Sequence, residues 1–234
     1  MQHKQRHSEI HTSDGQTRWL RAAVLGANDG ILSTASLIIG VASANGSHHG
    51  ILIAGTSALV AGALSMAAGE YVSVSSQADS EKADIEREKQ ELLDDHHGEL
   101  KELAGIYMKR GLDHNLALQV AEQLMNHDAL QAHTRDELGI LDTSKANPLQ
   151  AAVASAASFA MGSALPLLMA LLVPAPFLTR GVTVSSIIFL ASLGLIGAKL
   201  GKANPVKAAI RVTLWGVIAL VITAAIGKAF GTLP

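Results

Sequence analysis

Long runs of apolar residues, separated by short polar breaks, make up most of this chain of 234 residues. Five runs reach the length of about 20 apolar residues that a helix needs to cross the hydrocarbon core of a bilayer. They cover residues 22–44, 51–74, 149–173, 182–200 and 206–230. Five such runs in one chain are unusual for a soluble protein, so the pattern predicts five transmembrane helices.

Between the second and third runs lies a polar region with its own helical signals. Residues 80–95 follow the second run without Pro or Gly, which predicts that the helix continues. A second helix is expected to end at Gly111, and Asp113 is a suitable N-cap for a third, from about Asn115 to Leu138. The fold class is therefore predicted to be an all-α integral membrane protein with a three-helix insert between transmembrane helices 2 and 3.

Charge divides the chain in the same way. We predict a polar N-terminus at 1–17, transmembrane helices 1–2 at 18–76, the insert at 77–147 and transmembrane helices 3–5 at 148–234. The insert holds sixteen of the 20 acidic residues but eight of the 18 basic ones, so its net charge is −8, against +6 for the rest. There is no Cys, which excludes disulfides and thiolate metal sites.

The positions of Lys and Arg predict the orientation in the membrane. The loops at 45–50 and 174–181 contain one basic residue between them, Arg180, whereas the other connections and the N-terminus are basic. Because basic loops stay in the cytoplasm, we expect the N-terminus and the insert there and the C-terminus outside. The N-terminus lacks the features of a signal peptide, and the compact chain fits a bacterial plasma membrane better than a vacuole.

Acidic residues also occur inside the first two apolar runs, where a carboxylate costs about 2.5–3.5 kcal/mol. Asp29 lies 18 residues before Ser47, near the centre of the turn, and Met66 lies 19 residues after it, so a hairpin places both at the same depth. Glu70 is one helical turn further on the same face. We name Asp29, Met66 and Glu70 as candidate translocation-path residues. The alternatives are a packing role for Met66 and interfacial positions for the two acids.

The insert carries a regular set of carboxylates. Five acids repeat at helical spacing between residues 81 and 95, a Glu-x-x-Glu pair occurs twice, and a histidine precedes two acids at i+3 and i+4. Oxygen ligands with an imidazole suit ferrous iron, manganese or zinc. The alternative is a solvated acidic surface. The candidate metal ligands are Glu88, Glu91, Glu99, Glu102, His133, Asp136 and Glu137.

These motifs together resemble the vacuolar iron transporter family. The resemblance rests on residues 26–30 (GANDG), 65–73 (SMAAGEYVS), the Glu88/Glu91/Glu99/Glu102 array, and residues 127–130 leading to 136–139, and it covers nearly the whole chain after Thr17. It implies five membrane helices, a homodimer, and export of ferrous iron, often also manganese, from the cytosol in exchange for protons. It also implies path roles for Asp29 and Met66, and metal binding by that glutamate array and Glu137. One departure is His133-Thr134, where plant members have methionines, which leaves the metal preference open.

The resulting hypothesis is a proton-coupled transporter of Fe²⁺ or Mn²⁺, with Co²⁺ and Zn²⁺ as further candidate cargos and no other cofactor. Its expected partners are the lipid bilayer, a second copy of the chain, metal ions and protons, and no nucleic acid. No nucleotide-binding loop and no nucleophile–base arrangement is present in the sequence, so we expect no enzyme. The alternative is a membrane-anchored metal sensor or scaffold that does not transport.

Overall fold

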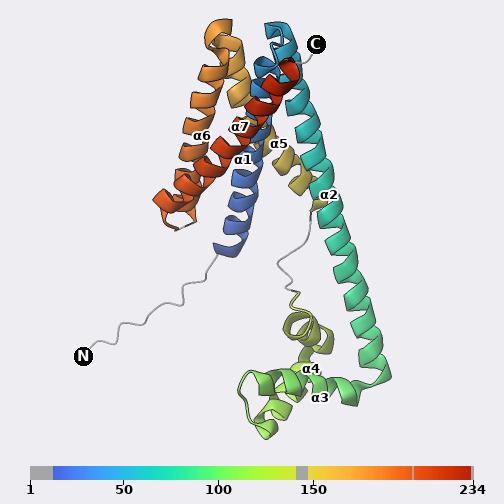
Figure 1. The fold of residues 1–234 in the computed structure, drawn as a ribbon. Helices are drawn as coiled ribbons and strands as arrows, with labels where there is room; N and C mark the ends of the chain where they lie inside the picture. Colours follow the sequence, from blue (N-terminus) through green and yellow to red (C-terminus); the bar gives the residue numbers. More distant parts are fainter. Residues whose placement is uncertain (1–12, 141–146, 202, 233–234) are drawn as a thin grey trace, which may run out of the picture. The chain divides into compact units, whose positions relative to one another are not determined.

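Helices make up all the regular structure that the computed structural model describes, which covers residues 13–140, 147–201 and 203–232, with side chains from Ala23 onward. No strand occurs in this part of the chain (Figure 1). Most of the N-terminus expected at 1–17 lies outside the described residues, as do residues 141–146 of the insert. The elements are α1 (Ser13–Ser43), α2 (His48–Asp94), α3 (His96–Lys109), α4 (His114–Asp136), α5 (Pro148–Leu172), the 3-10 helix η1 (Ala175–Phe177), α6 (Leu178–Leu200) and α7 (Pro205–Gly231).

Five of these helices, α1, α2, α5, α6 and α7, are long and apolar enough to cross a membrane, which confirms the predicted number of spans. The chain forms two compact units. We call residues 1–70 and 150–234 the membrane unit and residues 71–149 the insert unit. Helix α2 contributes to both, because it is continuous over 47 residues and has no Pro or Gly after Gly69.

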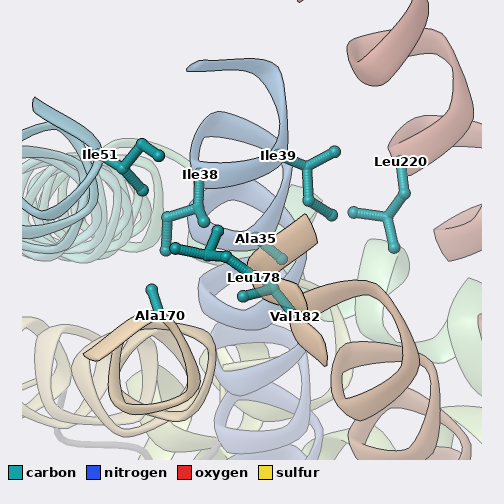
Figure 2. Close-up of a cluster of buried hydrophobic side chains, with 8 residues drawn as sticks. All are labelled: Ala35, Ile38, Ile39, Ile51, Ala170, Leu178, Val182 and Leu220. Carbon is teal, nitrogen blue, oxygen red and sulfur yellow. The ribbon is translucent and has the colours of Figure 1, made fainter. Parts of the chain in front are cut away.

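The interior of the membrane unit is apolar and centres on α1. Ala35, Ile38 and Ile39 of α1 are almost completely buried, and side chains from the other four membrane helices surround them (Figure 2). These neighbours are Ile51, Ala170, Leu178, Val182 and Leu220. The close packing of this cluster supplies the dispersion contacts that hold membrane helices together, because lipid gives no hydrophobic drive for association.

Small residues allow α1 and α5 to approach each other closely. A Cβ atom at Gly162 would lie 2.8 Å from the carbonyl carbon of Ala27, and one at Gly30 would lie 2.8 Å from the amide nitrogen of Ser163. In return, Ser163 Oγ donates a hydrogen bond of 3.2 Å to the Gly30 carbonyl oxygen. The spacing of small residues in these helices therefore serves backbone contact within one chain.

The outer surface of the membrane unit is apolar as well. On α7, Leu214 and Trp215 are 56% and 65% exposed, and α2 exposes Val60 and Leu64. In the most apolar 18-residue stretch of α2, only 11% is buried within the chain, and the same holds for α7. Such surfaces suit a lipid environment.

The insert unit has a separate small core between α3 and α4. Each of these helices begins at an aspartate that accepts hydrogen bonds from the first turn: Asp95 from the Gly98 amide and Asp113 from the amides of Asn115 and Leu116. The predicted N-cap at Asp113 is thus confirmed. The buried core residues are Leu103, Ala104, Ala117, Ala121, Met125 and Ala132.

Candidate metal site

Helix α2 brings the first candidate ligand, Glu88, to the insert. Glu88 and Leu92 are four residues apart and so share one face of the helix, and Leu92 packs against the insert core. Glu88 is therefore turned inward, and its side chain is only 2% exposed. Glu91, on the same predicted acidic stripe, is exposed.

Helix α3 supplies Glu99 from its first turn. Because Asp95 caps this helix, the acid that the sequence placed on the α2 stripe holds the start of α3 instead. Glu99 precedes the fully buried Leu103 by four residues, so both lie on the inward face. The side chain of Glu99 is 13% exposed, whereas Glu102 points to solvent.

Helix α4 is broken where the sequence predicts a continuous helix. Asp128 has non-helical dihedral angles (φ −160°, ψ 96°), and its Oδ1 accepts a hydrogen bond of 2.9 Å from the Gln131 amide. The aspartate thus acts as an N-cap that restarts the helix. The restarted segment carries Ala132 into the core and buries His133 completely.

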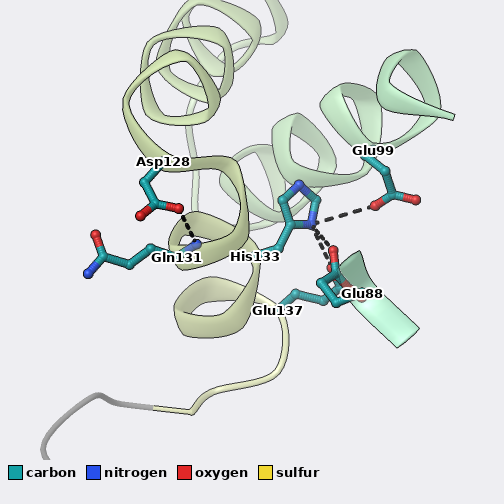
Figure 3. A network of polar contacts seen from close by, with 6 residues as sticks. All are labelled: Glu88, Glu99, Asp128, Gln131, His133 and Glu137. Atoms are coloured by element: carbon teal, nitrogen blue, oxygen red, sulfur yellow. Dashed lines mark hydrogen bonds and ion pairs between the residues drawn. The ribbon is translucent and has the colours of Figure 1, made fainter. Parts of the chain in front are cut away.

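Four side chains converge on one point: Glu88 of α2, Glu99 of α3, His133 of α4, and Glu137 directly after α4 (Figure 3). His133 Nδ1 lies 2.9 Å from Glu137 Oε2, 3.0 Å from Glu88 Oε1 and 3.6 Å from Glu99 Oε2. One ligand atom from each residue falls within 4.8 Å of all the others. We call these four residues the Glu₃His cluster.

The spacing of the Glu₃His cluster fits a metal ion. An ion about 2.1 Å from its ligands places neighbouring octahedral ligands about 3.0 Å apart and tetrahedral ones about 3.4 Å apart. The three distances from His133 Nδ1 bracket these values. Glu88 Oε1 is buried and has no hydrogen-bond partner among the described residues, so it is available to an ion.

Electrostatics also favour a cation at this position. Burial raises the pKa of Glu88 to about 7, with further increases from Glu137, Glu99 and Glu91 and an opposing effect of His133. Burial likewise raises the pKa of Glu99, although His133 again acts in the opposite direction. Three carboxylates therefore share a partly buried space with one imidazole, and a divalent cation would neutralise their excess negative charge.

Asp136, also predicted as a ligand, lies in a different set of contacts. Its Oδ2 accepts a hydrogen bond of 2.7 Å from the Tyr107 hydroxyl, and its Oδ1 one of 2.6 Å from Arg110. Burial would raise the pKa of Asp136, but the bonds from Arg110 and Tyr107 lower it below its usual value. Asp136 therefore ties the end of α4 to α3, one residue before Glu137 of the Glu₃His cluster.

The three candidate path residues belong to the membrane unit. Asp29 is exposed on α1, while Met66 and Glu70 on α2 are partly exposed. Next to Asp29, the Oδ1 atom of Asn28 is buried without a hydrogen-bond partner among the described residues. Asn28 is not among the residues predicted for the path, although an amide beside an acid in an apolar helix is a sequence signal for such a site.

The fold and the cluster point to the class of membrane metal transporters, and comparison with known proteins supports this class. The VIT family matches residues 20–228, and the chain belongs to this family. The resemblance seen in the sequence is thereby confirmed.

Named relatives cover most of the chain. A vacuolar iron transporter of Acanthamoeba castellanii is 47% identical over 227 residues, which are 96% of this chain and 84% of the relative. Vacuolar iron transporter homolog 1 of Oryza sativa subsp. japonica is 38% identical, over 92% of this chain and 75% of its own length. Vacuolar iron transporter homolog 2.1 of Arabidopsis thaliana is 35% identical, over 93% and 84%.

Proposed function

We propose that this protein moves divalent iron or manganese out of the cytosol in exchange for protons. The observation that carries the proposal is the Glu₃His cluster, with its ion-sized spacing and its buried Glu88 oxygen that accepts no hydrogen bond from the described residues, in a chain of the VIT family. The names of the relatives support iron as the cargo.

In this proposal the insert collects the metal. The carboxylates Glu88, Glu99 and Glu137 supply charge, and His133 supplies a nitrogen. Glu91 and Glu102 are exposed nearby in the sequence, and we assign them to weaker, outer binding. Asp136 would have to leave Tyr107 and Arg110 before it could bind an ion, so we expect it to contribute least.

The membrane unit then carries the ion across. Asp29 provides a carboxylate within an apolar helix, Met66 a thioether and Glu70 a second carboxylate. A thioether beside oxygen ligands favours transition metals over Mg²⁺. Protons compete with the metal for the same carboxylates, and the raised pKa of Glu88 supports such competition near neutral pH in the insert.

A second copy of the chain is part of the proposal. The apolar window of α2 is only 11% buried in a single chain, and its exposed residues include Val60 and Leu64. This face suits a helix-packed dimer, and lipid is the alternative cover.

With the insert in the cytoplasm, the direction of transport is the same for the plasma membrane predicted from the sequence as for a vacuolar membrane.

Metal flux into proteoliposomes under an imposed pH gradient tests the proposal. Wild-type protein should move Fe²⁺, and the rate of flux should increase with the pH gradient. Asp29→Ala should abolish flux and leave calorimetric metal binding by the insert intact, because Asp29 belongs to the other unit. The matched control is Asp79→Ala, which removes an exposed acid of α2 and should keep flux. Normal flux in Asp29→Ala would remove Asp29 from the path.

The second candidate function is a membrane-anchored metal sensor. It is favoured by one observation, that all four members of the Glu₃His cluster belong to the insert unit. A sensor binds metal but does not move it. Wild-type protein that binds iron with its cluster intact, and shows no flux under any gradient, would establish this function instead.

A further inference from the structure

One member of the Glu₃His cluster differs chemically from the rest. His133 is the only nitrogen donor in the cluster, and its Nδ1 is the atom that the three carboxylates approach. The side chain is 0% exposed, so its ring has no room to turn into solvent. The other ring nitrogen, Nε2, is buried and has no hydrogen-bond partner among the described residues.

A purely structural role for His133 leaves this arrangement poorly satisfied. A ring nitrogen carries at most one hydrogen, and the contact with Glu137 Oε2 uses it. Glu88 Oε1 lies 3.0 Å from the same nitrogen but accepts no hydrogen bond, although it is buried. An unsatisfied buried carboxylate oxygen is costly, whereas a metal ion can satisfy all three carboxylates and the nitrogen together.

We propose that His133 Nδ1 binds the metal directly and is the residue that decides which cations the insert accepts. The inference rests on the proposed function, in which the Glu₃His cluster holds the transported ion, and it adds the chemical class of that ion. With Nδ1 on the metal, the proton of the neutral ring resides on Nε2.

The donor set of three carboxylate oxygens and one imidazole nitrogen defines that class. Mg²⁺ and Ca²⁺ take oxygen ligands, so an obligatory nitrogen disfavours them. Imidazole suits iron, cobalt and zinc, and affinity rises from Mn²⁺ through Fe²⁺ and Co²⁺ in the general order for such sites. The insert therefore accepts borderline transition cations, rejects the abundant Mg²⁺, and binds Mn²⁺ most weakly among its candidate cargos.

The local fold holds the nitrogen in place. Asp128 restarts α4, Ala132 anchors the new segment in the insert core, and His133 follows directly. While this segment is folded, the nitrogen keeps one position, so it discriminates between cations by geometry as well as by atom type.

Pulsed electron paramagnetic resonance of Mn²⁺ bound to the full-length protein in detergent tests direct ligation. We expect modulation from a coordinated ¹⁴N nucleus in wild type, its loss in His133→Gln, and its retention in His127→Gln. His127 is the matched control, since it is an exposed histidine on the same helix and lies outside the cluster. A nitrogen signal that persists in His133→Gln with Mn²⁺ bound overturns the inference.

Competition between Zn²⁺ and Mn²⁺ tests the selectivity. The ratio of their affinities should fall in His133→Gln by at least about tenfold, the lower end of the loss that even outer-shell changes cause. His133→Glu is the second variant because it keeps a ligand and makes the set all-oxygen, so it should gain Ca²⁺ binding. An unchanged Zn²⁺ preference in His133→Glu contradicts the inference.

The failures of the two proposals can be told apart. Wild-type protein that binds Mn²⁺ in a Glu88-dependent manner but shows no nitrogen signal refutes the role of His133 and leaves the metal site standing. Wild-type protein whose metal binding does not change in Glu88→Gln refutes the site itself, and the inference with it. If His133→Gln does not fold, His133→Glu should still bind Mn²⁺ and lose the nitrogen signal, and absence of the signal in wild type refutes the role of His133 without any variant.

Discussion

The two units of this protein bury opposite kinds of side chain. In the described part of the membrane unit, the buried polar side chains are hydroxyls such as Thr34 and Ser163, and the helices meet through glycines. In the insert unit, a carboxylate and an imidazole, Glu88 and His133, are as deeply buried as the apolar core. The interior of the membrane unit is therefore uniformly apolar or weakly polar. The interior of the insert unit, which carries the excess of acidic residues, also holds ionisable side chains.

The difference shows where each unit derives its stability. The membrane unit depends on backbone contact, since lipid outside is as apolar as the side chains inside. The insert has a small core of mostly alanines and accepts a destabilising carboxylate beside it. Buried ionisable groups with strongly shifted pKa values, such as Glu88, are typical of functional sites. The membrane unit should therefore be sensitive to volume, and the insert to charge and to metal.

The strongest test of this comparison is to add side-chain volume at a glycine where two helices touch. Gly162→Ala puts a Cβ against the Ala27 backbone, including its Cα at 2.9 Å, and neither backbone can yield easily. We expect a loss of about 3 kcal/mol or more, at the upper end for overpacking. The measurement is thermal unfolding in detergent, followed by circular dichroism.

The matched substitution lies in the insert. A Cβ at Gly105 meets nothing within 4 Å, so Gly105→Ala should raise stability by about 0.5–1 kcal/mol through helix propensity. Equal destabilisation by both substitutions would mean that volume limits the two units alike.

Removal of a buried charge from the insert should have the next largest effect, on metal affinity and on stability. Glu88→Gln removes a proposed ligand, so metal affinity should fall by at least about ten- to a hundredfold. The metal-free protein should become more stable, because one of the three buried carboxylates that repel one another around His133 loses its charge. Calorimetric titration and thermal unfolding measure the two effects. Glu86→Gln is the control, because Glu86 is exposed and pairs with Lys89 on the surface. Loss of both affinity and metal-free stability would indicate that Glu88 is structural.

The dependence on pH follows from the raised pKa of Glu88. In the folded protein this pKa is about 7, above the ordinary 4.5, so the folded state binds the proton more tightly than the unfolded one. The contribution to metal-free stability is therefore complete below pH 4.5 and is lost as the pH rises through 7. Metal affinity should run the opposite way, and fall by up to about tenfold per pH unit below 7 for each proton displaced.

Melting temperatures between pH 5 and 8, with and without Zn²⁺, measure both trends. The stabilisation by the ion should be larger at pH 8 than at pH 6, and Glu88→Gln should flatten the metal-free trend. A pH profile that is the same in wild type and Glu88→Gln would assign the titration to another group.

Much of the architecture follows from local rules that a sequence displays. The five spans, the continuation of α2 and the cap at Asp113 depend on apolar length, on the absence of Pro and Gly, and on one side chain. The break at Asp128 does not follow, because an aspartate inside a polar helix gives the same pattern whether it caps or faces water. The sequence pattern also does not distinguish His133 from Asp136. His133 joins the cluster, whereas Asp136 accepts hydrogen bonds from a tyrosine and an arginine, and these tertiary contacts cannot be read from the spacing.

The break in α4 has a consequence for how long an ion stays. The segment from Ala129 to Asp136 is much shorter than the roughly 12–15 residues that an isolated helix needs for marginal stability in water, so its order depends on what it touches. Two of the four proposed ligands, His133 and Glu137, are attached to this segment and its end. Brief local unfolding of two helical turns would detach half of the ligands at once while the core of α3 and the first part of α4 stayed folded. We expect the opening rate of this segment to set the residence time of an ion bound there, and we expect a bound ion to slow amide hydrogen exchange along the segment.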